Sequence, residues 1–413
     1  MKDPNFFEGL DPAALSREFG TPLYLYNERV FRARCREMRS LVTYPHFSVN
    51  FSVKANSNLT LLKIAREEGL SVDAMSPGEI FLEEQAGFTP EKIFYISNNV
   101  SLEEMDFAVR RGIVVSLDSL SQLERFAAAF PGAAISLRIN SGIGAGHSDK
   151  VVTGGKKTKF AIPLDQLDDA LSIVRASSLH LVGLNQHIGS FFLDKEIYLE
   201  GVRALLQVAM EIPGLSFIDC GGGFGMPYDE QSQHRLDLQD LGRSLDELFV
   251  DFNDRYQSRY GNASQDILFK IEPGRYLAAE CGLLMGTVHA LKENAGHRYC
   301  GTDIGFNVLI RPMLYDAYHK IETWPVRPEA KEYPYTVVGN ICESGDILAK
   351  DRLLPEMRED DLILIHDAGA YGFSMASNYN NRLRPAEVLI QEGGSVRLIR
   401  RRESLEDLLR CFP

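Results

Sequence analysis

The chain has 413 residues, 45% of them apolar, and a formal net charge of −13. That length is typical of two domains, or of one large α/β domain with an appendage. The acidic balance argues against a nucleic-acid partner and against an anionic membrane surface, because both bind clustered Lys and Arg. We therefore expect a small molecule or another protein as the partner.

The cysteines and the N-terminus indicate the compartment. Six cysteines are scattered without a CxxC pair or a metal-like histidine spacing, namely Cys35, Cys220, Cys281, Cys300, Cys342 and Cys411. This is typical of a reducing environment and argues against a disulfide framework or a zinc site. The start MKDPNFFEGLDPAAL lacks a secretory pattern, and no apolar run approaches the roughly 18 residues that span a bilayer. We expect a cytoplasmic protein with no membrane segment and no metal.

Eight short runs rich in β-branched and aromatic residues alternate with longer amphipathic segments between residues 47 and 274. The runs are FSVNFSVKA (47–55), SVDAMS (71–76), IFYIS (93–97), VVSLDS (114–119), ISLRIN (135–140), VGLNQHIG (182–189), SFIDCGGG (216–223) and ILFKIEPG (267–274). Intervening segments such as LTLLKIAREEG have helical apolar spacing and end on a glycine suited to a helix C-cap. Eight such units predict an α/β fold, a (β/α)8 barrel, since open doubly wound sheets more often have five or six strands.

The chain changes character from about residue 281, where short strand-like runs such as YTVVGNIC, LILIHDA and SVRLIRR follow one another with little helix before ESLEDLLRC. We predict a β-rich sandwich or barrel domain there. The run TPLYLYN (21–27) fits either domain and is assigned to the β domain. The predicted division is a barrel over 28–280 and a β domain over 1–27 and 281–413.

The segment SGIGAGHSDKVVTGGKKTK (141–159) lies between the fifth and sixth predicted strands. It fits neither the P-loop pattern nor GxGxxG. We interpret it as a long loop that could serve as a lid, and not as a nucleotide cradle.

Reactive groups stand at the ends of the predicted strands, and in such a barrel the loops after the strands' carboxyl ends build the active site. The first strand ends in Lys54, the sixth in His187 with Gly189 and Ser190, the seventh in GGGFG (221–225) and the eighth in Glu272 to Arg275. Each has an ordinary alternative: a solvated rim lysine, a hydrogen-bonded core histidine, or glycines that only turn the chain. Their placement at strand ends of one barrel favours a shared site.

This set of groups meets the needs of pyridoxal phosphate. A lysine amine can hold an aldehyde covalently, a glycine-rich turn lets backbone N–H groups approach a phosphate, and an imidazole can stack on a flat ring. An acid can keep the pyridine nitrogen protonated, which makes the ring a strong electron sink. The acid at 272 therefore favours loss of CO2 from an amino acid, whereas an arginine there would weaken the sink.

The sequence resembles the fold-type III pyridoxal-phosphate decarboxylases, and within them the branch of carboxy-lyases that acts on meso-2,6-diaminopimelate. The matching stretches span nearly the whole chain in order: SVKAN (52–56), QHIGS (186–190), DCGGGFG (219–225), EPGR (272–275), GFNVLIRPMLYDAYH (305–319), CESGDILAKDR (342–352) and GAYGFSMASNYNNRLRPAEVL (369–389). The family's barrel and C-terminal β domain agree with the predicted architecture. The resemblance implies decarboxylation of that substrate to L-lysine, the last step of lysine biosynthesis.

Within the barrel, the resemblance implies Lys54 as the Schiff-base lysine, His187 as the group stacked on the ring and Glu272 as the partner of its nitrogen. The phosphate would be surrounded by backbone and side chains of Ser190, Gly221, Gly222, Gly223, Gly225, Gly274 and Arg275.

In the β domain, Tyr371 would contact both cofactor and substrate. Arg275 with Arg311 and Tyr315 would hold the distal end of the substrate, because guanidinium groups bind carboxylates in bidentate fashion. Glu343 would recognise its amino group and Cys342 would donate the proton. In the family the last two come from the partner subunit of a homodimer, with the active site at the interface.

Two positions depart from the family pattern, Phe191 after HisIleGlySer and Leu383 in ArgLeuArgPro (382–385). A relative that acts on a carrier-bound glutamyl group would share most of these residues. A racemase on the same barrel and a non-catalytic pyridoxal-phosphate carrier also stay open. Cys342 could be a packing residue, and Arg275 and Arg311 could be structural ion-pair partners.

Overall fold

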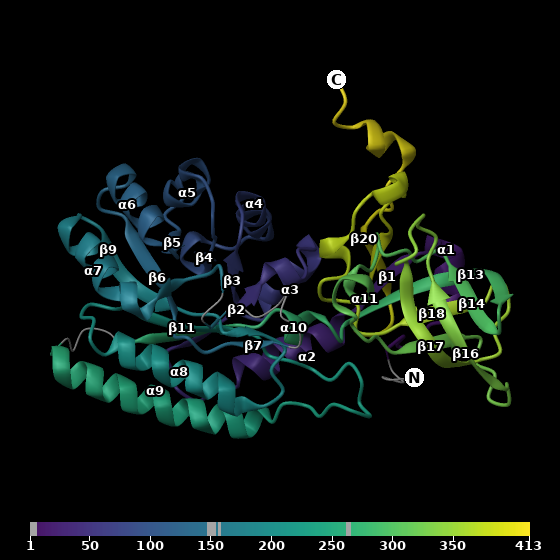
Figure 1. Ribbon diagram of the computed structural model, residues 1–413, viewed down its shortest axis with the longest axis horizontal. Helices are drawn as coiled ribbons and strands as arrows, with labels where there is room; N and C mark the ends of the chain where they lie inside the picture. The colour runs from purple at the N-terminus through teal and green to yellow at the C-terminus, as the bar shows by residue number, and fades with distance from the viewer. Residues whose placement is uncertain (1–5, 147–153, 156–157, 262–265) are drawn as a thin grey trace. The chain divides into compact units, whose positions relative to one another are not determined.

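The computed structural model describes residues 6–146, 154, 155, 158–261 and 266–413, and the chain forms two compact units (Figure 1). Cys35–Pro227 with His234–Tyr276 form one, called here the barrel unit. Met1–Arg34, Tyr228–Gln233 and Leu277–Pro413 form the other, called here the β unit. No helix among the described residues is long and apolar enough to cross a membrane.

Eight parallel strands form the barrel. In spatial order they are β2 (Phe47–Ser52), β3 (Ser71–Ala74), β4 (Ile93–Tyr95), β5 (Val114–Leu117), β6 (Ala134–Asn140), β9 (His180–Asn185), β11 (Phe217–Gly222) and β12 (Leu268–Glu272). The ring is closed because β5 pairs with β6 and β12 pairs with β2. Each strand overlaps one of the eight predicted runs, with β6 and β9 beginning one and two residues earlier than predicted, so the predicted (β/α)8 barrel is confirmed.

Helices follow the strands and lie outside them in Figure 1. They are α3 (Leu59–Glu67), α4 (Pro77–Ala86), α5 (Leu102–Val109), α6 (Leu120–Ala129), α7 (Leu167–Ala176), α8 (Lys195–Ala209), α9 (Leu238–Tyr260) and the short α10 (Arg275–Ala278), while α2 (Glu28–Arg39) precedes β2. Side chains cap the first turns of α3, α4, α5, α6, α8 and α9, as where Ser101 and Glu104 form a capping box on α5. The predicted glycine cap of α4 is Gly87, in the left-handed conformation with φ 91°.

The inner side of the barrel changes from apolar to polar along the strands. At their amino ends Phe94 and Phe217 belong to a buried cluster that Val114 and Leu268 pack against. Further along, the hydroxyl of Ser116 on β5 donates to Oδ1 of Asn185 on β9 over 2.8 Å. Because β6 lies between those two strands in the sheet, this bond crosses the interior. The polar half of the barrel is therefore the half at the strands' carboxyl ends.

The β unit is built on a mixed sheet. Its strands are β1 (Leu23–Asn27), β13 (Gly282–Asn294), β14 (His297–Thr302), β15 (Ile321–Trp324), β16 (Glu332–Val338), β17 (Ile347–Pro355), β18 (Leu362–Ile365), β19 (Ala386–Ile390) and β20 (Val396–Arg400), with helices α1 (Pro12–Phe19) and α11 (Arg311–Tyr315). The separate β-rich domain expected after the barrel is thus present. Strand β1 pairs antiparallel with β13 and parallel with β19, which places the run 21–27 in this unit. Its core includes Leu23, Met285 and Val388.

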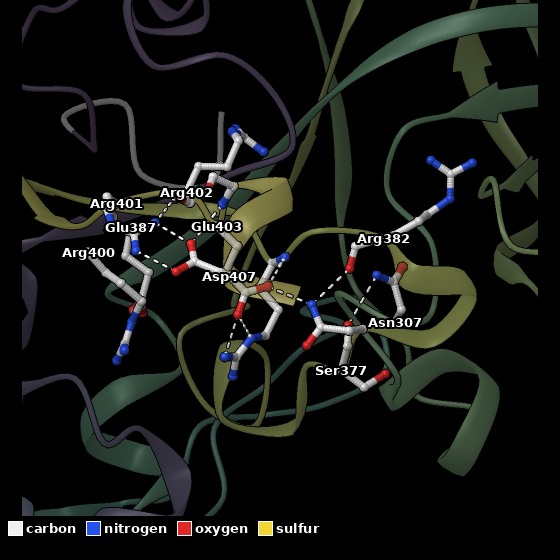
Figure 2. A network of polar contacts seen from close by, with 12 residues as sticks. Asn307, Ser377, Arg382, Glu387, Arg400, Arg401, Arg402, Glu403 and Asp407 are labelled. Carbon is white, nitrogen blue, oxygen red and sulfur yellow. Dashed lines mark hydrogen bonds and ion pairs between the residues drawn. The ribbon is translucent and has the colours of Figure 1, made fainter. Parts of the chain in front are cut away.

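The C-terminal segment is held by ion pairs on the β unit, as Figure 2 shows. The buried carboxylate of Glu387 pairs with Arg400, Glu403 with Arg384, and Asp407 with Arg401. The predicted helix ESLEDLLRC forms a short 3-10 helix, η7 (Leu405–Leu409).

Short elements lie near the predicted lid. Strand β7 (Ala145–Gly146) pairs with β10 (Gly189–Ser190), and β8 (Ile162–Pro163) pairs with the end of β6. Residues 147–153, 156 and 157 of the predicted lid lie outside the described residues.

Candidate active site

Lys54 lies just beyond the end of β2, in a single 3-10 turn, η1 (Val53–Ala55). The sequence predicted that the strand would continue to this lysine. The strand stops at Ser52, where the side chain turns inward and its hydroxyl donates to Oδ2 of Asp73 over 3.2 Å. Immediately after η1, Oδ1 of Asn56 accepts from the N–H of Asn58, so local side-chain bonds favour a turn over an extended strand.

The half-buried ammonium group of Lys54 faces carboxyl groups. Burial raises the pKa of Asp73, Glu79 and Glu272, and the positive charge of Lys54 opposes that rise in all three. The same charge lowers the pKa of His187. Lys54 therefore shares one electrostatic environment with the imidazole and the acid predicted at the other strand ends.

His187 follows β9 and is fixed by the last residue of β11. The backbone N–H of Gly222 donates to its Nδ1 over 3.1 Å, so Nδ1 is the unprotonated nitrogen of the ring. Burial, Lys54 and Arg138 hold the pKa of His187 well below its usual range. Although Nδ1 lies 3.7 Å from Oε2 of Glu272, the imidazole is neutral, and the contact is no ion pair.

Glu272 is the last residue of β12 and is 4% exposed. Its Oε1 has no hydrogen-bond partner among the described residues. Burial raises the pKa of this carboxyl well above its usual range, with the charges of Asp219 and Asp73 adding to the rise, whereas Lys54 and Arg138 oppose it. A buried acid with an unsatisfied oxygen is suited to a ligand atom that carries a proton.

The glycine turn lets three backbone segments approach one another. A Cβ at Gly222 would lie 2.0 Å from the carbonyl oxygen of Glu272, and one at Gly223 would lie 2.4 Å from the carbonyl oxygen of Gly189. The φ of Gly223 is 104°, which L side chains rarely adopt. A side chain at Gly222 or Gly223 is thus excluded, and the turn presents backbone groups at these two positions.

Ser190 and Arg275 meet beside that turn. The Nη2 of Arg275 donates to Oγ of Ser190 over 3.2 Å, although Arg275 belongs to α10 and Ser190 to β10. Phe191, the first departure from the family pattern, has φ 74° and donates its N–H to the carbonyl oxygen of Gly223. The barrel unit therefore brings together the predicted residues at positions 54, 187, 190, 221–225, 272, 274 and 275.

The remaining predicted residues belong to the β unit. Arg311 begins α11 and is 2% exposed. Its Nη1 lies 2.8 Å from Nε2 of His319, and its guanidinium lies over the ring of Tyr228. Because arginine only donates, Nε2 of His319 accepts and its Nδ1–H donates to the carbonyl oxygen of His366. These contacts fix the plane of the Arg311 guanidinium; Tyr315 ends the same short helix.

Cys342 and Glu343 are exposed on the loop between β16 and β17. Of the six cysteines four are buried, so Cys342 differs from those that serve as small packing groups. Tyr371 has φ 56°, a conformation that is uncommon for a bulky residue.

Four charged residues in the polar half of the barrel interior were missed by the sequence reasoning, namely Asp73, Arg138, Asp219 and Lys270. They affect the pKa values of Glu272, His187 or one another. The ammonium of Lys270 also lies 4.1 Å from the centre of the Phe217 ring. Each stands inside a predicted buried strand, and a charge at such a position was the signal available.

Comparison with known proteins shows the family of the chain. Residues 28–279 match the family described as "Pyridoxal-dependent decarboxylase, pyridoxal binding domain". A diaminopimelate decarboxylase of Methanothermobacter thermautotrophicus is 39% identical over 97% of this chain and 94% of its own length. That of Escherichia coli K12 is 32% identical over 96% and 94%.

A solved structure is similar to this chain over both units. A diaminopimelate decarboxylase from Helicobacter pylori complexed with L-lysine has a TM-score of 0.86 at 31% identity. The match covers 97% of this chain and 98% of the Helicobacter pylori chain. The chain belongs to the pyridoxal-dependent decarboxylase family, in its group of diaminopimelate decarboxylases.

Proposed function

We propose that this chain decarboxylates meso-2,6-diaminopimelate to L-lysine and CO2, with pyridoxal 5′-phosphate as its cofactor. Relatives with the corresponding name are similar over nearly the full length of the chain, including the β unit. The observation that carries the choice of reaction is the acid at the end of the last barrel strand, Glu272, beside a neutral His187.

The barrel residues fit this cofactor. The turn of Gly222 and Gly223 has no room for side chains at these positions, so its backbone groups could bind a phosphate. Ser190 and the Gly274–Arg275 turn would complete this phosphate site. The Oε1 of Glu272 lacks a partner among the described residues and can accept from a protonated ring nitrogen. When bound, the cofactor supplies a sink for the electron pair that the departing CO2 leaves behind.

Each barrel residue then has one task. Lys54 would hold the cofactor aldehyde covalently through its amine. His187 would stack on the cofactor ring, as the resemblance implies, and because its pKa is lowered it would add no charge that competes with a protonated ring nitrogen. Glu272 keeps that nitrogen protonated, because a carboxyl with a raised pKa and a pyridine nitrogen readily share one proton.

The substrate residues are proposed by the same resemblance. Arg275, Arg311 and Tyr315 bind the distal carboxylate, and Tyr371 contacts both cofactor and substrate. Glu343 binds the distal amino group and Cys342 gives a proton to the carbon that lost CO2. We further propose a homodimer in which Cys342 and Glu343 serve the partner's site. The proposed barrel domain comprises residues 28–280, and the rest of the chain forms the β domain. We also propose a cytoplasmic location, which the six free cysteines support.

Substrate choice tests the proposal. The purified protein loaded with pyridoxal phosphate should release CO2 from meso-diaminopimelate, and not from L-ornithine or L-arginine, whose distal ends are cationic and would be repelled by the two arginines. Release from ornithine alone would contradict it. Bound cofactor with no CO2 from any free amino acid would favour a carrier-bound substrate or a non-catalytic carrier instead.

A further inference from the structure

The loop that carries Cys342 and Glu343 has little packing of its own. Both side chains are exposed, and so are Ser344 and Gly345 after them. An exposed loop without packed side chains samples many conformations unless other groups hold it. Precise placement of a proton donor and a substrate carboxylate therefore requires tethers from elsewhere in the β unit.

One tether ends on Glu343. The hydroxyl of Tyr379 donates to Oε1 of Glu343 over 2.6 Å, a short bond of the charge-assisted kind. The Tyr379 ring stacks on Phe306, with centroids 5.6 Å apart and planes 24° from parallel. Phe306 is itself fixed, since its N–H donates to Oδ1 of Asp346 at the far end of the same loop. Tyr379 thus links Glu343 to a fixed ring.

A second tether ends on Cys342. Its backbone N–H donates to Oδ1 of Asn380 over 2.8 Å. Asn380 has φ 55° and ψ 22°, a left-handed conformation that asparagine adopts more readily than most residues. Next to it, Nε of Arg382 donates to the carbonyl oxygen of Asn340. Three residues within the stretch 379–382 therefore bind three residues within 340–343.

The stretch 377–382 is itself anchored through its first two residues. The N–H of Ser377 donates to the carbonyl oxygen of Asn307 over 2.8 Å, and both residues are drawn in Figure 2. The side-chain amide of Asn378 donates to Oε2 of Glu403 over 2.6 Å, and Glu403 also pairs with Arg384. These contacts tie the stretch to the rest of the β unit.

We propose that Tyr379 and Asn380 are positioning residues for the reaction: Tyr379 aims the Glu343 carboxylate at the substrate's distal amino group, and Asn380 sets the position of the Cys342 proton donor. The inference rests on the proposed function. It assigns the two tethers separable effects, since Glu343 binds substrate whereas Cys342 takes part in the chemical step.

Tyr379→Phe removes the hydroxyl and keeps the ring that stacks on Phe306. We expect the KM for meso-diaminopimelate and the dissociation constant of L-lysine to rise by about tenfold, as for loss of a hydrogen bond to a charged group, with kcat within twofold. The cofactor absorption band should not change. Tyr299→Phe, which removes a hydroxyl on β14 of the same unit, is the control and should alter none of these values.

Asn380→Gly keeps a residue suited to the left-handed conformation and removes the acceptor for Cys342. We expect kcat to fall by about tenfold with KM within twofold, because the proton donor is misplaced while substrate contacts persist. An equal effect of both variants on both parameters, with lowered melting temperatures, would show a merely structural role and overturn the proposal.

Glu343→Gln separates this inference from the function on which it rests. We expect Glu343→Gln to raise KM, and Tyr379→Phe to add little in that background, because the two residues act as one unit. If Glu343→Gln raises KM while Tyr379→Phe alone leaves it unchanged, the positioning role is overturned and the function stands. If Glu343→Gln leaves KM unchanged, the substrate role of Glu343 fails and the positioning role of Tyr379 fails with it.

Discussion

The carboxyl groups of the barrel interior and the loop of Cys342 and Glu343 in the β unit are held in opposite ways. In the barrel unit Glu272 and Asp219 are buried, and the backbone around Gly222 is too close for any side chain. In the β unit Cys342 and Glu343 are exposed, and each has one hydrogen bond to the stretch 377–382, Cys342 with Asn380 and Glu343 with Tyr379. Burial therefore fixes the carboxyl groups of the barrel unit, whereas Cys342 and Glu343 depend on the two tethers for their position.

The largest effect should come from the barrel side of this comparison. Lys54→Ala removes the only amine proposed to bond the cofactor, so turnover should fall on the order of a thousandfold or more. The cofactor should also wash out on dialysis, measured by its absorbance. Lys63→Ala, an exposed lysine on α3, is the control. Normal turnover by Lys54→Ala would remove the covalent role from this residue.

Cys342→Ala tests the exposed side. Loss of the proton donor should lower kcat by about a hundredfold, since positioned acids contribute on that scale. Cofactor affinity and absorbance should stay as in the unaltered protein, because Cys342 is not among the residues proposed to bind the cofactor. The matched control is Cys411→Ala, the other exposed cysteine. Equal losses in both variants would contradict the assignment.

Gly222→Ala sharpens the contrast on the barrel side. The new Cβ would lie 2.0 Å from the carbonyl oxygen of Glu272, so the strand ends must move apart and the phosphate cradle opens. We expect cofactor affinity to fall by about tenfold or more, read by titration, with the KM of reloaded protein less affected. Gly78→Ala in α4, where the nearest atom is 3.7 Å away, should leave the affinity unchanged.

The smallest effect concerns stability. Burial and three neighbouring acids raise the pKa of Glu83 to about 9 from 4.5 in the unfolded chain. At a pH between these two values, Glu83 takes up a proton when the chain folds. The contribution of Glu83 to the free energy of unfolding is therefore complete below about pH 4.5 and is lost as the pH rises toward 9. The slope is at most about 1.4 kcal/mol per pH unit.

Glu83→Gln should remove that slope, so its melting temperature should fall less between pH 6 and pH 9 than that of the unaltered protein. Glu124→Gln, on the exposed side of α6, should keep the original dependence. Parallel melting curves for all three proteins across this range would mean that Glu83 is charged in the folded barrel.

The barrel could be predicted from the sequence because each of its strands is marked locally by residue type and period. The assignment of 21–27 to the β domain is confirmed, but the partners of this strand could not be predicted, since Leu283 on β13 and Ala386 on β19 are hundreds of positions away in the chain. The turn at Lys54 was missed because it depends on bonds of Ser52 and Asn56 that no strand pattern records. Likewise, Tyr379 and Glu343 are 36 positions apart, and only folding joins them.

The most direct test of the account is to convert meso-diaminopimelate in D2O with the cofactor-loaded protein and to analyse the products by mass spectrometry. The account predicts one L-lysine for each CO2, with a single deuterium on the ε-carbon, the carbon that lost its carboxylate. Diaminopimelate recovered with deuterium at an α-carbon, without lysine or CO2, would contradict it and identify a racemase on the same barrel.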